Sequence, residues 1–132
     1  MSTVESFEDL EIWQKSREIC QLVFDIHEPT NLGKDYKLYN QINGSSGSIM
    51  DNITEGFERG GNEEFGEFLS VSKASRGEAR SRFYRILDRK YISQKEFDDT
   101  YDTLMTLSKQ ISSLTNNLQK SDLKGSRFRS KP

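Results

Sequence analysis

The pattern that most constrains this chain is a repeat of apolar or small residues at alternating steps of three and four. It is cleanest in the last periodic segment, at Phe97, Tyr101, Leu104, Ser108, Ile111, Thr115 and Leu118. Side chains at this spacing share one side of an α-helix, because the helix turns once every 3.6 residues. No segment alternates strictly between apolar and polar residues, as a half-buried strand would. The fold class is therefore predicted to be all-α.

Three earlier segments carry the same spacing and predict helices over residues 8–27, 34–57 and 63–90. Loops are expected at 28–33 and 56–61, where proline, asparagine and glycine interrupt the pattern. Helix starts are indicated by two pairs with capping-box spacing and by one candidate N-cap: Ser6 with Asp9, Ser93 with Glu96, and Asn62.

The middle of the second predicted helix, residues 43–48, is poor in helix-forming residues. Each glycine there costs about 0.8–1 kcal/mol relative to alanine. The apolar spacing nevertheless continues from Ile42 to Ile49 without a shift. We therefore predict an unbroken helix whose small residues allow a neighbouring backbone to approach closely.

Four amphipathic helices with short connections bury their apolar sides most simply as a single-domain, antiparallel, up-down-up-down four-helix bundle. We assign residues 1–119 to this bundle and residues 120–132 to a disordered tail. The bundle carries 14 basic and 20 acidic residues, whereas the tail carries five basic residues and one acidic residue. The basic tail either contacts an anion such as nucleic acid or is a solvated terminus. Its candidate binding residues are Lys124, Arg127, Arg129 and Lys131.

Composition excludes several classes of protein. No apolar run approaches the roughly 20 residues needed to span a bilayer, and the acidic N-terminus does not resemble a signal peptide. The single cysteine, Cys20, excludes an internal disulfide framework and a cysteine-rich zinc site. We therefore expect a cytoplasmic protein without a membrane partner.

The residues of common catalytic sites do not occur together in this chain. The single histidine, His27, excludes the two Glu-x-x-His pairs of a di-iron bundle. We expect its side chain to interact favourably with the dipole at the C-terminus of its helix. Cys20 lies two turns, about 10 Å, from His27 and is expected to be a core residue. Residues 44–48 lack the lysine and the preceding strand of a phosphate-binding loop. We predict no enzymatic activity, no metal or other cofactor, and no small-molecule substrate.

Arg82, Arg85 and Arg89 are predicted on the side of the third helix opposite its apolar stripe. Three guanidinium groups on one side suit phosphate binding. The alternative is an ordinary solvated surface in which Glu78 pairs with Arg82. The absence of interleaved aromatic residues weakens any specificity for single strands.

Three segments, residues 7–16, 36–42 and 48–59, resemble one bacterial family. It consists of the four-helix-bundle proteins encoded within intervening sequences of 23S ribosomal RNA genes, with their free-standing relatives. The third-helix pattern of Glu64, Phe65, Phe68, Leu69, Ser72, Ser75 and Glu78 also matches. The most specific part is Asn52–Arg59, and the tail is not covered.

The resemblance implies a bundle that assembles into a ring, in related proteins a homopentamer with a central channel, without an established enzymatic activity. One branch of relatives is the accessory protein of diversity-generating retroelements, a basic barrel that binds a reverse transcriptase and nucleic acid. This chain departs from that branch, because its body is acidic and Asn43-Gly44 replace the usual Arg-Arg. Both departures weaken the expectation of nucleic-acid binding.

Within the family segment, one side of the helix carries Asn52, Glu55, Gly56 and Arg59. One hypothesis is a polar network between helices or subunits, with Gly56 allowing close approach. The alternative is that these residues only end the helix.

We expect a non-enzymatic homo-oligomer that forms a ring and serves as an interaction scaffold, with part of Trp13, Phe24 and Tyr39 facing another subunit. The alternative is a nucleic-acid-binding accessory protein that uses the arginine side and the tail. Phosphate binding weakens steeply with salt, whereas assembly through apolar surface does not. An enzyme would need a cleft formed only between subunits.

Overall fold

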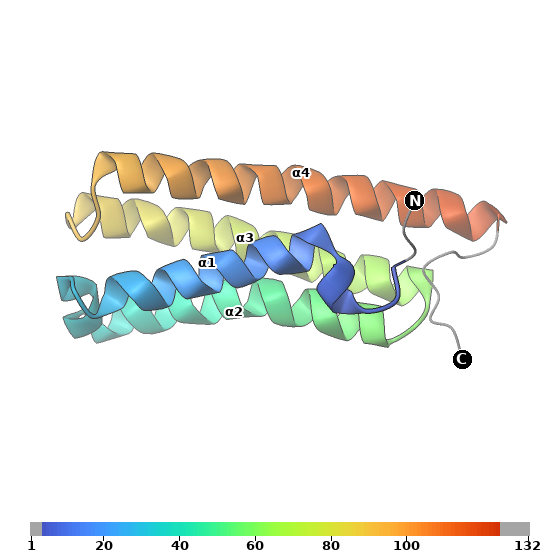
Figure 1. Cartoon of the computed structure of the whole chain (residues 1–132), viewed down its shortest axis with the longest axis horizontal. Coiled ribbons are helices and arrows are strands. Elements are labelled where there is room, and N and C mark those ends of the chain that lie inside the picture. The colour runs from blue at the N-terminus through green and yellow to red at the C-terminus, as the bar shows by residue number, and fades with distance from the viewer. Residues whose placement is uncertain (1–3, 125–132) are drawn as a thin grey trace.

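A computed structural model of the chain describes residues 4–124, which form four α-helices and two short 3₁₀ turns (Figure 1). The helices are α1 (Glu11–His27), α2 (Tyr36–Glu58), α3 (Asn62–Asp88) and α4 (Gln94–Lys124). The 3₁₀ turns are η1 (Phe7–Asp9), before α1, and η2 (Asn31–Lys34), between α1 and α2. Successive helices run antiparallel, which confirms the predicted all-α four-helix bundle.

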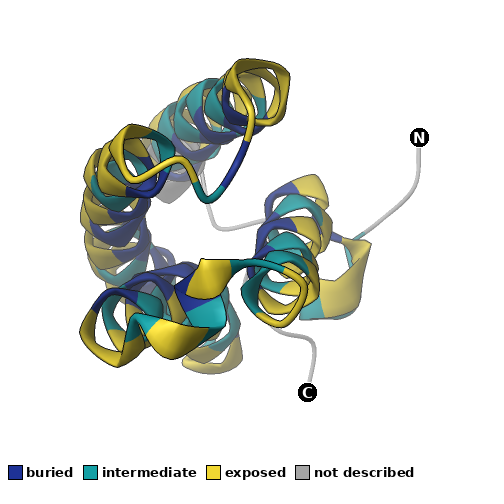
Figure 2. Cartoon of the chain, turned by 90° about the vertical axis from the view of Figure 1, so that its left-hand side faces the viewer, coloured by how far each residue is buried: buried dark blue, intermediate teal, exposed yellow. Residues whose placement is uncertain are grey.

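All four helices contribute buried residues to the core, and the buried stretches of their ribbons face the interior of the bundle (Figure 2). Three serines are part of this core, because Ser16, Ser46 and Ser72 are all buried, whereas Ser108 of the predicted stripe in α4 is half-buried. Ser16 and Ser46 donate hydrogen bonds to carbonyls one turn earlier in their own helices. Ser72 in α3 donates to the Ile49 carbonyl oxygen of α2 at 2.8 Å. Each buried hydroxyl is therefore satisfied, and a small residue at the helix crossing lets α2 and α3 approach.

The segment rich in glycine and serine is helical throughout α2, as predicted. We expected its small residues to let a neighbouring backbone approach closely. For the two glycines this was wrong within the described chain, because a Cβ atom at Gly44 or Gly47 would meet no atom within 4 Å. Serines make the close contacts instead: the Cys20 thiol of α1 donates to the Ser46 carbonyl oxygen at 3.4 Å. The small residues thus serve close packing at the serines, and two glycines stay open on the outside of α2.

The predicted caps differ in their outcomes. Ser93 and Glu96 form the expected capping box, in which each backbone nitrogen donates to the other side chain, at 2.8 and 3.1 Å. Ser6 and Asp9 also form a capping box, but it caps the start of η1 and not the start of α1. The extended residue Leu10 separates η1 from α1, so the α-helix begins three residues later than predicted.

The end of α2 and the start of α3 correct two further expectations. Gly61 is the N-cap of α3, because the Asn62 side chain is buried and donates to the Leu118 carbonyl oxygen of α4 at 3.3 Å. The loop expected at 56–61 is shorter, since α2 continues to Glu58. The helix α4 extends to Lys124, past the expected boundary at residue 119. None of the helices between residues 4 and 124 is long and apolar enough to cross a membrane.

Candidate functional site

Gly56 lies where the end of α2 packs on the start of α3. It is buried, and a Cβ atom there would lie 2.7 Å from Phe68 Cβ and 3.0 Å from Phe65 Cδ1. Atoms at the base of a side chain cannot move without the helix that carries them. The missing side chain therefore allows the close approach of α2 and α3 at this point.

The other three family-segment residues divide into two sets of contacts. Asn52 Nδ2 donates to the Ser48 carbonyl and hydroxyl oxygens at 2.8 and 3.0 Å, and the Ser48 hydroxyl meets the Ser75 hydroxyl of α3 at 2.8 Å. Glu55 and Arg59 form an exposed ion pair at 2.9 Å. The Arg59 guanidinium also lies 5.1 Å from the Phe68 ring centroid. Within this chain Asn52 thus links α2 to α3, and the Glu55–Arg59 pair stands apart from that link.

We expect Asn52→Ala to lower the free energy of unfolding by about 1 kcal/mol, because it removes partly buried hydrogen bonds. Glu55→Ala should change it by less than about 0.5 kcal/mol, since exposed ion pairs contribute little. Urea denaturation of the two variants measures the difference. A larger loss for Glu55→Ala would show that the ion pair has a buried partner in an assembly, and mass measurements on the same variant would then reveal a change of oligomer.

The three arginines selected from the sequence do not form one free surface. Arg82 donates to the Gln41 carbonyl oxygen of α2 at 2.9 Å, and this contact replaces the expected pairing with Glu78. Arg89 forms an ion pair with Asp35, at the start of α2. Arg85 is exposed and has no ion pair among residues 4–124. Two of the three guanidinium groups therefore connect α3 to α2.

Asp35 accepts hydrogen bonds from the Tyr91 hydroxyl, the Arg89 guanidinium and the Leu38 backbone N–H. The Tyr91 hydrogen bond, followed by the Arg89 contact, holds the pKa of the Asp35 carboxyl below its usual value. A lowered pKa in the folded protein means that the ionised carboxylate stabilises the fold above the ordinary aspartate pKa of about 3.9. This stabilisation is lost as the pH falls through the lower folded-state pKa.

Acidification from pH 5 to pH 2 should therefore lower the melting temperature of the wild type more than that of Asp35→Asn. Asparagine keeps an oxygen for Tyr91 and for the helix cap, and it carries no charge at either pH. Thermal melts followed by circular dichroism compare the two proteins. Equal losses would show that Asp35 does not contribute to the acid sensitivity.

The basic tail contributes no described site. Lys124 is the last residue of α4, and its side chain lies outside the described residues. Arg127, Arg129 and Lys131 also lie outside them. The proposed contact between this tail and an anion stays a prediction.

Arg76 was not among the cations that the sequence predicted to be functional. Arg76 in α3 is only 8% exposed, and it has no ion pair among residues 4–124. A signal was present, because Arg76 lies midway between Leu69 and Phe83, seven residues from each, in the core stripe of α3. An arginine at such a position is buried unless it reaches the edge of the helix interface.

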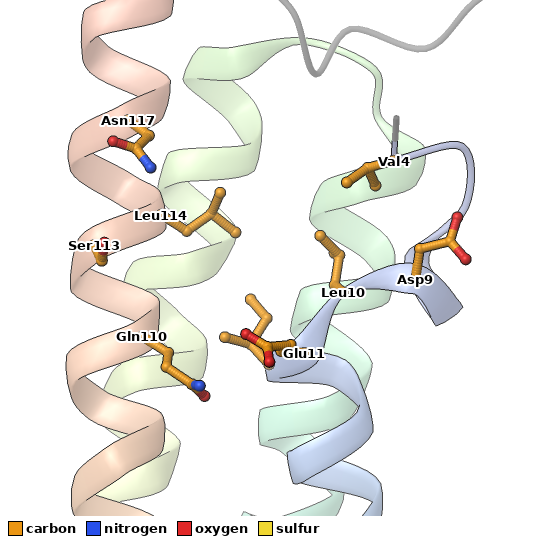
Figure 3. A pocket seen from close by; sticks show the side chains of 9 residues that line it. Val4, Asp9, Leu10, Glu11, Gln110, Ser113, Leu114 and Asn117 are labelled. Atoms are coloured by element: carbon orange, nitrogen blue, oxygen red, sulfur yellow. The ribbon is translucent and has the colours of Figure 1, made fainter. Parts of the chain in front are cut away.

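An open cavity of about 330 Å³ lies between the start of α1 and the C-terminal half of α4 (Figure 3). Leu10, just before α1, and Leu114 of α4 line it, and Asp9 of η1 and Glu11 of α1 lie at its edge. Gln110 also lines it, and its buried Oε1 has no hydrogen-bond partner. A second cavity, of about 180 Å³, opens between the same helices near Ile26. The α1–α4 seam is thus the loosest in the bundle.

Cys20 and His27 both make packing contacts within the bundle. Burial, with a smaller effect from the Asp51 charge, raises the pKa of the Cys20 thiol and disfavours the reactive thiolate. His27 stacks on Tyr39, with 4.6 Å between ring centroids, at the junction of α1 and α2. Across the described part of the chain, no three His, Cys, Asp or Glu side chains gather as metal ligands would.

Comparison with known proteins identifies the family. The model of the family described as "23S rRNA-intervening sequence protein" matches residues 8–113, which include α1, α2, α3 and most of α4. The chain belongs to the 23S rRNA-intervening sequence protein family. No curated protein matches it.

The fold of this family member is similar to that of a solved structure from Bacteroides thetaiotaomicron VPI-5482, described as a protein of unknown function from the S23 ribosomal protein family. The TM-score is 0.69 at 18% identity, over 80% of this chain and 95% of the other. At this identity the likeness shows the fold alone. The family match ends at residue 113, so it includes Gly56 and Asn52 and excludes the basic tail.

Proposed function

We propose that this member of the 23S rRNA-intervening sequence protein family is a non-enzymatic, cytoplasmic protein that self-assembles into a ring and acts as an interaction scaffold. The observation that carries the proposal is the exposure of large apolar side chains. Phe24 is 59% exposed, Tyr36 73%, Val71 49% and Tyr84 47%. Aromatic residues are enriched in the buried centres of protein interfaces, so their exposure favours association.

The exposed aromatic residues favour a ring over a two-fold dimer because they lie on two different surfaces. Phe24 and Tyr36 come from α1 and α2, whereas Tyr84 comes from α3. Contact between two different surfaces is head-to-tail, and it closes into a ring when the rotation between copies allows. The resemblance described above points to five subunits.

Nucleic-acid binding, as in the accessory protein of diversity-generating retroelements, is the alternative. It would need free cations, and Arg82 and Arg89 are engaged with Gln41 and Asp35. Arg85 remains available, and the body of the chain is acidic overall. These contacts support the scaffold over the alternative.

The test is the mass in solution, measured by analytical ultracentrifugation at about 50 and 500 mM salt, with and without a short structured RNA. The scaffold predicts an oligomer that persists at both salt concentrations and does not bind the RNA. A complex with RNA that disappears at high salt would favour the alternative. A monomer under all conditions would overturn the proposed assembly.

A further inference from the structure

The cavity between α1 and α4 has room for an aromatic side chain (Figure 3). Its apolar wall comes from Val4 and Leu10 on one side and from Leu114 of α4 on the other. Val4 and Leu114 are half-buried, so part of their surface is still uncovered. The volume is about 330 Å³. An apolar cavity of roughly 150 Å³ already holds benzene, so a phenyl ring and part of the backbone that carries it would fit here.

A polar group in this cavity also lacks a partner. Gln110 of α4 lines the cavity opposite Glu11, and its buried Oε1 accepts no hydrogen bond within the described chain (Figure 3). A buried acceptor without a donor is unfavourable. A peptide segment that lies in the cavity would bring backbone N–H groups as donors.

The α1 side of the cavity is negatively charged. Residues 4–16 contain four carboxylates and one cation, Lys15. Two of the carboxylates, Asp9 and Glu11, line the cavity and are exposed, and neither has an ion pair among residues 4–120. The lining residues that α4 contributes are uncharged. A cationic segment would therefore meet unpaired charges of the opposite sign at this edge.

The segment that follows α4 has the complementary composition. Residues 125–132 lie outside the described residues, and their sequence is Gly-Ser-Arg-Phe-Arg-Ser-Lys-Pro. The segment carries three cations and no carboxylate side chain. Its one aromatic residue, Phe128, stands between Arg127 and Arg129. One apolar ring with a cation on either side matches an apolar cavity with carboxylates at its edge.

The same segment is long enough to return along α4 to the cavity. Asn117, which lines the near end of the cavity, is seven helical residues before Lys124, or about 10 Å along the axis. Gln110 is about 21 Å from Lys124 by the same measure. An extended chain spans about 3.3 Å per residue, so residues 125–128 cover about 13 Å and residues 125–132 about 26 Å. Gly125 directly follows the helix, where glycine favours a change of chain direction.

We propose that residues 125–132 fold back along α4 of their own chain and place Phe128 in the cavity between Val4 and Leu114. Arg127 and Arg129 then face the carboxylates of Asp9 and Glu11. This docking does not depend on the proposed self-assembly. It covers the α1–α4 seam and pairs the cations of the tail, so a docked tail is not free to contact nucleic acid.

Disulfide trapping tests where the tail lies. The chain carries Ser130→Cys in the tail and Cys20→Ser, which removes the native thiol and keeps a donor for the Ser46 carbonyl oxygen. Into it we introduce either Ser113→Cys, at an exposed position that lines the cavity, or Gln119→Cys. Gln119 is also exposed, does not line the cavity and lies nearer the tail along α4.

Docking predicts that the Ser113→Cys chain forms an internal disulfide at least about tenfold faster than the Gln119→Cys chain, because docking raises the effective concentration of the tail thiol at the cavity. Non-reducing gels and mass spectrometry measure the two rates. Equal rates, or a faster reaction at Gln119→Cys, would overturn the docking. Disulfides that form mainly between chains at low protein concentration would place the tail on a neighbouring copy and would also overturn it.

Cleavage of the tail by trypsin tests the contacts that hold it. Phe128→Ser should speed cleavage at Arg127 and Arg129 by about tenfold or more, since it removes the buried ring. Each rate is divided by that of the free peptide 125–132 with the same sequence, which corrects for the preference of the protease. Protection that is equal in the wild type and in Phe128→Ser would refute the placement of the ring.

A pair of glutamate substitutions tests the charges in the same assay. Glu11→Gln should speed cleavage about two- to fivefold, the effect of one exposed ion pair. Glu18→Gln is the control, because Glu18 is exposed, lies two turns further along the same side of α1 and does not line the cavity. Equal rates in the two variants would refute the pairing with Glu11. If the thiols show no preference for the cavity and a single-stranded RNA probe protects the tail, the tail is a nucleic-acid contact and the docking is wrong.

Discussion

Gly56→Leu should lower the free energy of unfolding by about 2–3 kcal/mol, the upper part of the range for overpacking a helix contact. The first atom of the new side chain would overlap Phe68 Cβ, and the remainder would enter the space of the Phe65 ring. Leucine has a better helix propensity than glycine by somewhat under 1 kcal/mol, so the expected loss is net of a local gain. The overlap dominates because α2 and α3 pack together more extensively than any other pair of helices.

The control for this substitution is Gly44→Leu in the same helix, where a Cβ atom meets nothing within 4 Å. There the gain in helix propensity should appear alone, so the two variants should change stability in opposite directions. Urea denaturation, followed by circular dichroism at a fixed protein concentration, measures both. If the two variants unfold at the same urea concentration, α2 and α3 do not meet closely at Gly56.

Phe83→Ala should lower the free energy of unfolding by about 3–5 kcal/mol. The Phe83 ring is 1% exposed and is among the largest fully buried side chains of the described residues. Its removal leaves a cavity in the part of the core where α3 meets its neighbours, and the surrounding structure relaxes into such a cavity only in part. Against a total stability of about 5–15 kcal/mol for a domain, this is a large fraction.

The matched control is Val71→Ala, which truncates an apolar side chain on the same helix that is 49% exposed. The expected change there is within about 0.5 kcal/mol. Calorimetry reports both variants through their melting temperatures and unfolding enthalpies. A loss below about 1 kcal/mol for Phe83→Ala would mean that the α3 core is packed differently.

The four helices were predictable because the three-and-four spacing depends on residues that are local in sequence. The spacing was recognisable even across the glycines and serines of α2, because Ile42 and Ile49 before and after them are seven residues apart and lie on the same side of the helix. Helix ends were less predictable. The Asn62 side chain was expected to cap α3. It donates a hydrogen bond to the Leu118 carbonyl oxygen of α4 instead, 56 residues away in sequence. Local pattern cannot show a partner that only the tertiary fold provides.

The same reason explains which parts of the candidate site were missed. The side of a helix on which Arg82 lies follows from the sequence, but its contact with Gln41 depends on the register between α2 and α3. The grouping of Arg76 and Arg80 around Met105 depends on how α4 lies against α3. The contact of Gly56 with Phe65 and Phe68, in contrast, agrees with the hypothesis of close approach. These residues lie on either side of the short connection between α2 and α3, so their proximity depends on the nearby sequence.

The connectivity of the bundle also bears on how quickly the chain folds. The extensive helix contacts join neighbours along the chain, α1 with α2, α2 with α3 and α3 with α4, whereas the α1–α4 seam has fewer contacts than these three. Domains dominated by contacts between residues near in sequence reach the native state within microseconds to milliseconds, because few long loops must close first. Each newly synthesised helix can therefore dock on the one before it. On this account the chain completes its own fold before the self-assembly that we propose can begin.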